Sequence, residues 1–232
     1  MYNNKVKYIL FDLDGTLIDS APDIAAAVNA TLVDIGKEEY PLATIKTWIG
    51  NGAKTLLKRA LTGSIDEEPD QVLLEQTLPR FFEHYGQNLS GDTYVYSGVL
   101  EALATLSSEG MQLACVTNKP IEFVQPILNA YQMNQFIQLS VGGGSLPELK
   151  PSAAPLVFAC EQLGHDLKSD PDKVIMVGDS ASDILAANAA RIKSIAVDYG
   201  YPQGQDLISL GASALISSMD CLLYTSPSPR DS

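Results

Sequence analysis

Four short segments of the chain are rich in apolar and β-branched residues and show little polar alternation. They lie at residues 5–15, 111–118, 173–180 and 194–200. This is the pattern of parallel strands that are covered on both faces. Helical patterns separate them, at residues 98–110, 153–164 and 182–191. The last of these helices is expected to begin at Ser182, a residue type that caps helices. Alternating strands and helices predict an α/β fold, a Rossmann-like open parallel sheet with right-handed crossovers.

Residues 19–90 break this alternation, because they contain successive helical patterns with no convincing strand between them. Helices alone cannot extend a sheet, so we predict that this block is a small α-helical cap domain inserted after the first strand. The catalytic core is then discontinuous and consists of residues 1–18 and 91–220. Residues 221–232 carry two Ser-Pro steps and little apolar content, and we predict that they form a disordered or non-native tail.

The charge balance narrows the class of partner. Lys and Arg total 15 against 28 Asp and Glu, a net charge of -13, which repels a nucleic-acid backbone, and no basic run offsets it. The three cysteines lack zinc-type spacing, and no segment approaches the length of a membrane span. We therefore expect a cytoplasmic protein that binds neither nucleic acid nor a membrane.

Polar residues follow the predicted strands at the points where those strands end. Ligands of open α/β sheets bind at the carboxyl ends of strands, where the loops diverge. Each feature alone has an ordinary explanation, such as a turn, a solvated lysine or a helix cap. Their shared position and order instead favour a single site, formed by Asp12, Asp14, Thr117, Asn118, Lys150, Asp179 and Asp183.

The segments "FDLDGTLIDS" and "VGDSASDI", with Thr117 and Lys150 between them, resemble the haloacid dehalogenase-like hydrolase superfamily. The resemblance implies that Asp12 is the nucleophile that takes the phosphoryl group and Asp14 the general acid/base. It implies that Thr117 holds a phosphate oxygen, with Asn118 beside it. Dehalogenating members lack the second aspartate, so Asp14 favours phosphoryl chemistry.

The same resemblance implies that Lys150 neutralises the nucleophile and the phosphate. It implies that Asp179 ligates magnesium together with Asp12 and a backbone carbonyl near Asp14, and that Asp183 supports the metal site. The chemistry agrees, because Mg²⁺ prefers oxygen ligands and phosphoryl transfer needs neutralised oxygens. We expect Asp14 to carry a proton at the start of the reaction.

The predicted cap resembles that of bacterial phosphoglycolate phosphatases, in residues 19–32 and 47–61. Gly50, Asn51 and Gly52 form a turn that offers backbone N–H groups to an anion such as a carboxylate. From the residues alone, an ordinary helix–helix turn is the commoner explanation. Lys54 and Arg59 follow on the same predicted helix as candidates for contact with a substrate carboxylate, although a solvated arginine is equally expected.

We therefore predict a Mg²⁺-dependent phosphatase that hydrolyses 2-phosphoglycolate, a small anionic phosphate ester, through an aspartyl-phosphate. The alternatives are a capped phosphatase for a sugar phosphate, nucleotide or pyrophosphate, and a phosphomutase on the same core. A non-catalytic binding protein is a further alternative, which the complete set of polar residues disfavours.

Overall fold

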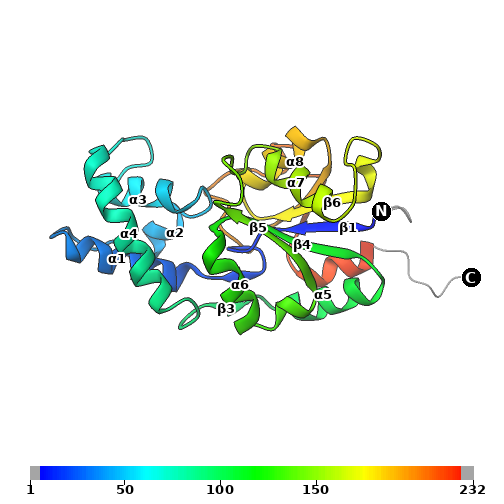
Figure 1. Cartoon of the computed structure of the whole chain (residues 1–232), viewed down its shortest axis with the longest axis horizontal. Coiled ribbons are helices and arrows are strands. Elements are labelled where there is room, and N and C mark those ends of the chain that lie inside the picture. The colour runs from blue at the N-terminus through cyan, green and yellow to red at the C-terminus, as the bar shows by residue number, and fades with distance from the viewer. Residues whose placement is uncertain (1–5, 226–232) are drawn as a thin grey trace, which may run out of the picture.

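The structure is a computed structural model that describes residues 6–225 (Figure 1). Its centre is a six-stranded sheet in the order β5-β4-β1-β6-β7-β8, and every neighbouring pair of strands is parallel. The strands are β1 (Tyr8–Phe11), β4 (Gln112–Pro120), β5 (Ile137–Gly143), β6 (Val174–Gly178), β7 (Lys193–Val197) and β8 (Ala214–Ile216). The predicted fold class is confirmed, although β5 and β8 were not among the predicted strands.

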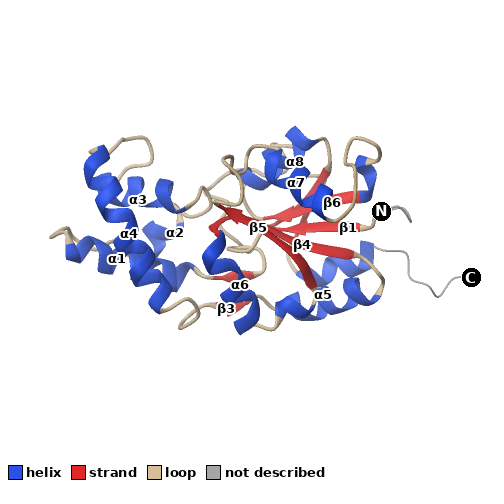
Figure 2. Cartoon of the chain, viewed as in Figure 1, coloured by secondary structure: helices blue, strands red, loops and turns tan. Residues whose placement is uncertain are grey.

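Helices cover both faces of the sheet, with α5 and α6 on one side and α7 and α8 on the other (Figure 2). The alternation of side chains along β1 explains this arrangement, because neighbouring residues of a strand point to opposite faces. Ile9 and Phe11 pack in the cluster that contains α5, whereas Leu10 packs in the cluster that contains α7 and α8. These helices are α5 (Val99–Ser108), α6 (Ile121–Ala130), α7 (Ala154–Gln162) and α8 (Ala181–Ala190), with short 3₁₀ turns η1 (Met133–Gln135) and η2 (Pro171–Lys173).

The start of α8 corrects one prediction. Ser180, not Ser182, is the N-cap residue, and it forms a reciprocal capping box with Asp183. A serine followed three residues later by an acidic residue satisfies two backbone N–H groups at once. That reciprocity places the N-cap two residues before the predicted one, and the helix begins at Ala181.

Four helices form a separate layer at one end of the molecule, at the left in Figure 1. They are α1 (Ala21–Asp34), α2 (Leu42–Lys46), α3 (Ala53–Thr62) and α4 (Gln71–Gln87). The chain leaves the core through β2 (Ile18–Asp19) and returns through β3 (Tyr94–Val95), and these two short strands pair antiparallel. The helices lie inside the block predicted as a cap, and the two connections to the core are hydrogen-bonded to each other.

The predicted tail starts too early. The turn η3 (Met219–Thr225) packs against α5, and Leu222 is only 5% exposed. Leu222 therefore belongs to the hydrophobic core, and burying its side chain contributes to stability. Residues 226–232, the rest of the predicted tail, lie outside the described residues. Within residues 6–225, none of the helices is long and apolar enough to cross a bilayer.

A buried carboxylate fastens the returning segment to the cap. Asp23 of α1 is 2% exposed and accepts hydrogen bonds from Thr93 Oγ1 at 2.6 Å and Thr93 N at 2.9 Å. It also accepts from the backbone N of Asp92 at 3.0 Å and from Asn88 Nδ2. One side chain thus satisfies several donors between α4 and β3.

Replacing Asp23 by Asn should lower the free energy of unfolding by about 1–3 kcal/mol, because an NH₂ group would face donors and leave at least one unsatisfied. Urea denaturation of Asp23→Asn measures this loss. The same change at the exposed Glu39 of the cap, Glu39→Gln, is the matched control. Equal free energies of unfolding for the two variants would contradict this stabilising role of Asp23.

Candidate active site

The parallel register brings the predicted site residues to one edge of the sheet. Phe11 of β1 lies beside Cys115 of β4 and Val177 of β6. The residues that follow these positions therefore emerge together from three adjacent strands. The side chains at these strand ends are buried, and they are Asp12, Thr117, Asn118 and Asp179. Lys150 from a neighbouring loop and Asp183 from α8 are buried beside them.

Lys150 is the cation at the centre of this group. Its Nζ lies 2.9 Å from Asp12 Oδ1 and 2.6 Å from Asp183 Oδ1, and it donates to the carbonyl oxygen of Val116 at 2.6 Å. Burial disfavours the ammonium, but the two carboxylates outweigh it, so the pKa of Lys150 is raised above its ordinary value. This lysine therefore has two hydrogen-bond acceptors and an ion pair with Asp12.

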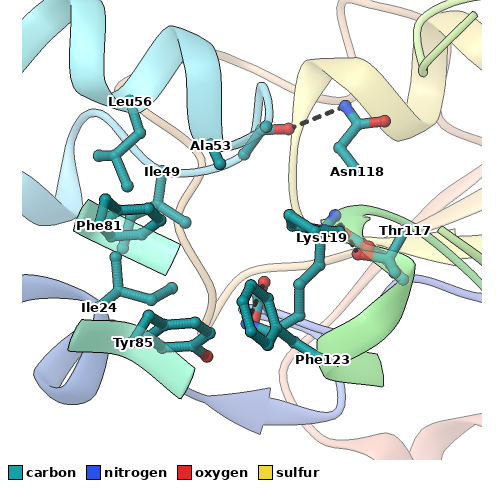
Figure 3. Close-up of a pocket in the computed structure, with 15 residues that line it drawn as sticks. Ile24, Ile49, Ala53, Leu56, Phe81, Tyr85, Thr117, Asn118, Lys119 and Phe123 are labelled. Carbon is teal, nitrogen blue, oxygen red and sulfur yellow. Dashed lines mark hydrogen bonds and ion pairs between the residues drawn. The ribbon is translucent and has the colours of Figure 1, made fainter. Parts of the chain in front are cut away.

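Asn118 fixes Lys150 in place. Its Oδ1 accepts from Lys150 N and its Nδ2 donates to Lys150 O, both at 2.9 Å. The same Nδ2 donates to Gly50 O of the cap at 3.1 Å, the dashed line in Figure 3. The amide thus joins the lysine loop to the cap, a role that the sequence analysis did not foresee. Thr117 Oγ1 accepts from Lys119 N at 3.2 Å, and its own O–H remains available as a donor.

Asp12, Asp179 and Asp183 each offer an oxygen atom, and these atoms all lie within 4.8 Å of one another. Burial raises the pKa of Asp12 to about 6, against the opposing effect of Lys150. Burial, followed by the charges of Asp12 and Asp183, raises the pKa of Asp179 well above its ordinary value. Burial is the larger cause of both raised pKa values, and the charges of the neighbouring carboxylates add to it.

The donor set of this cluster fits a divalent cation. Three carboxylates and the ammonium of Lys150 leave two formal negative charges, and all the ligand atoms are hard oxygens. Asp183 is already engaged on both oxygens, with Lys150 on Oδ1 and Ser180 on Oδ2. Asp179 is held by Thr16 Oγ1 and Tyr201 N. Each of the three carboxylates therefore already has a protein partner, and a bound cation would share their oxygen atoms.

Asp14 points away from this cluster. Lys119 Nζ lies 2.9 and 3.1 Å from its two oxygens, and Ser20 Oγ donates to Oδ1 at 2.5 Å. Sequence analysis missed Lys119, which is a side chain only 3% exposed. A lysine between Asn118 and Pro120 is ordinarily expected to be solvated, so no local pattern indicated this pair.

The predicted cap loop meets the core directly. Gly50 and Gly52 have backbone φ angles of 118° and 86°, which residues other than glycine rarely adopt. Asn51 Nδ2 donates to Ser182 Oγ at 3.0 Å, which fastens the loop to the start of α8. Arg59 does not reach the core, because its Nη1 donates to Trp48 O at 2.7 Å and so holds the backbone before the loop.

A pocket lies between the cap and the core (Figure 3). Ile24, Phe81 and Tyr85 line it from the cap, and Thr117, Lys119 and Phe123 line it from the core. Asp12 and Asp14 are also exposed to it. The pocket thus combines carboxylates at its core end with largely apolar walls from the cap.

Comparison with known proteins explains this arrangement of carboxylates and lysines beside a pocket. The sequence model of the haloacid dehalogenase-like hydrolases matches residues 9–197. The chain belongs to this family. A phosphoglycolate phosphatase of Colwellia psychrerythraea is 44% identical over 94% of this chain and 95% of its own length. One from Nitrosospira multiformis is 42% identical over 92% of both chains.

A solved structure agrees with these relatives. The crystal structure of a predicted phosphoglycolate phosphatase from Haemophilus somnus has a TM-score of 0.87 and 35% sequence identity, and the match covers 96% of this chain and 99% of that one. The resemblance to haloacid dehalogenase-like hydrolases is therefore confirmed. Phosphatases of this family generally use a divalent metal, which fits the charge of the acidic cluster.

A divalent cation should raise the melting temperature of the protein, because it relieves repulsion in the folded state alone. A ligand at about 100 times its Kd stabilises by about 2.7 kcal/mol. Calorimetry with Mg²⁺ or Mn²⁺, against NaCl of equal ionic strength, should show this shift in wild-type protein and a much smaller one in Asp179→Asn. The control is Asp172→Asn, whose aspartate is exposed beside Lys193. The same shift in both variants would contradict the proposed site.

Proposed function

We propose that this hydrolase is a Mg²⁺-dependent phosphatase that converts 2-phosphoglycolate and water to glycolate and phosphate. The observation that carries the proposal is the buried Asp12–Lys150 pair at the core end of a capped pocket. Two relatives more than 40% identical over almost their whole length carry the name phosphoglycolate phosphatase. The pocket and the relatives together support a small, anionic phosphate ester as substrate.

Asp12 and Asp179, with a backbone carbonyl near Asp14, would hold Mg²⁺, and Asp183 would support them. When bound, the cation supplies positive charge that stabilises the phosphoryl oxygens in the transition state. Lys150 contributes a second positive charge at the same place, because its Nζ lies beside the Asp12 oxygen. Asp12 is therefore held close to a cation that also attracts the phosphate.

The proposed reaction has two steps. A carboxylate oxygen of Asp12 attacks phosphorus, the bond from phosphorus to the ester oxygen breaks, and the departing glycolate oxygen takes a proton from Asp14. Water then attacks phosphorus, gives a proton to Asp14 and releases the Asp12 carboxylate. The O–H of Thr117 would donate to a phosphate oxygen in both steps. Asp14 ends each cycle with the proton that it had at the start.

Replacing Asp12 by Asn should reduce kcat by at least about a thousandfold, because the amide is a poor nucleophile. The measurement is phosphate release from 2-phosphoglycolate with Mg²⁺, with the melting temperature as a check on folding. Asp172→Asn should keep the wild-type rate. A folded Asp12→Asn protein with wild-type turnover would exclude the mechanism.

The substrate is tested by ranking kcat/KM over 2-phosphoglycolate, glucose 6-phosphate, a nucleoside monophosphate and pyrophosphate. We expect 2-phosphoglycolate to rank first. A higher value for glucose 6-phosphate or for the nucleotide would overturn the substrate assignment and leave the phosphatase assignment in place.

A further inference from the structure

One corner of the pocket holds a cation and a hydroxyl that the reaction steps above do not use. Lys119 of β4 and Tyr85 of α4 meet there across the boundary between core and cap (Figure 3). The Lys119 Nζ lies 4.5 Å from the centre of the Tyr85 ring, and both residues are at most 5% exposed. A buried charge at this place requires explanation, because taking an ammonium out of water costs several kcal/mol unless it is paired.

The pairing of Lys119 is incomplete. An ammonium has three N–H donors, and Asp14 is its hydrogen-bonded partner through both carboxylate oxygens. Beyond Asp14, the ammonium of Lys119 faces the ring and hydroxyl of Tyr85 at the pocket wall. Lys150 is more closely surrounded, because Val116 O and Asp183 Oδ1 accept hydrogen bonds from it and Asp12 Oδ1 lies 2.9 Å away. Of these two buried lysines, Lys119 is the one that lines the pocket and so can meet a ligand.

The hydroxyl of Tyr85 is also without a partner. It is buried and has no hydrogen bond in the described structure. Burial raises the pKa of Tyr85 to about 12, so the group keeps its proton at neutral pH. The neighbouring Lys119 is itself a donor and cannot accept that proton. An unsatisfied buried hydroxyl costs about 1–3 kcal/mol, which an acceptor in the pocket would remove.

The remainder of the wall offers little to a polar substrate. Ile24, Ile49, Leu56, Phe81 and Phe123 surround the corner and carry no polar side-chain atoms. A sugar phosphate would bury several hydroxyls against this wall without partners, at a cost for each one. A short substrate with a single acceptor group at its far end would bury no such unpaired hydroxyls.

The two residues that the sequence analysis suggested for contact with a substrate carboxylate do not lie in this corner of the pocket. Lys54 is exposed, and Arg59 donates to the Trp48 carbonyl. Lys119 instead follows Thr117 by two residues on β4, and both residues line the pocket. A phosphate held at Thr117 therefore leaves the other end of a short substrate near Lys119.

We propose that Lys119 and Tyr85 bind the carboxylate of the substrate, the end that is not transferred, and so select phosphorylated short-chain acids over phosphorylated sugars. The Tyr85 O–H and an N–H of Lys119 donate to the carboxylate oxygens. This inference rests on the proposed function, and it assigns specificity to a core lysine and a cap tyrosine that lie adjacent across the boundary between core and cap.

The test compares two substrates that differ only at the far end, 2-phosphoglycolate and ethyl phosphate, in which a methyl group replaces the carboxylate. The quantity is the ratio of their kcat/KM values. Tyr85→Phe should lower this ratio about tenfold or more, and Lys119→Met about ten- to hundredfold, because each removes a hydrogen bond to a charged group. Competitive inhibition by glycolate should weaken by similar factors.

Tyr96→Phe is the matched control. Its hydroxyl is also buried without a hydrogen bond, but Tyr96 does not line the pocket. The ratio in this variant should equal that of the wild type. Lys119→Met leaves Asp14 without its ammonium and can fail to fold, and in that event Tyr85→Phe and glycolate inhibition decide the question.

The outcomes separate the two proposals. A wild-type preference for 2-phosphoglycolate that persists in Tyr85→Phe, with unchanged glycolate inhibition, overturns this inference and leaves the proposed function standing. A wild-type enzyme that hydrolyses ethyl phosphate as efficiently as 2-phosphoglycolate overturns the substrate assignment itself. A preference that is lost in the pocket variants and kept in Tyr96→Phe supports both.

Discussion

Electrostatic repulsion among three buried carboxylates is the constraint on which the site depends. Asp12, Asp179 and Asp183 lie within 4.8 Å of one another, and Lys150 neutralises only part of their charge. Asn118 holds the backbone of this lysine on both sides and also binds the cap through Gly50 O. The position of the central lysine and the position of the cap are therefore linked by one amide.

A second lysine separates the two aspartates of the first strand end. Asp12 pairs with Lys150 inside the carboxylate cluster, whereas Asp14 pairs with Lys119 at the pocket wall. Only one residue separates the two acids in the sequence, yet they lie in different electrostatic surroundings. This division places the proposed nucleophile, Asp12, and the proposed proton carrier, Asp14, beside different lysines.

The strand ends were predictable because polar residues that follow apolar runs are conspicuous, and parallel strands bring them to one edge. Lys119, the partner of Asp14, was not predictable, because a lysine between Asn118 and Pro120 is expected to be solvated unless the pairing of strands is known. The start of α8 at Ala181 depended on the reciprocal bonds of Ser180, and the burial of Leu222 depended on its contact with the core, which no local pattern encodes.

The most direct test of this account is to trap the covalent intermediate. The protein is mixed with 2-phosphoglycolate and Mg²⁺, treated with borohydride, which reduces an acyl phosphate to an alcohol, and mapped by peptide mass spectrometry. The account predicts homoserine at residue 12, formed only when substrate is present. Reduction at Asp14 or Asp179 instead, or turnover with no reduced aspartate, would contradict it.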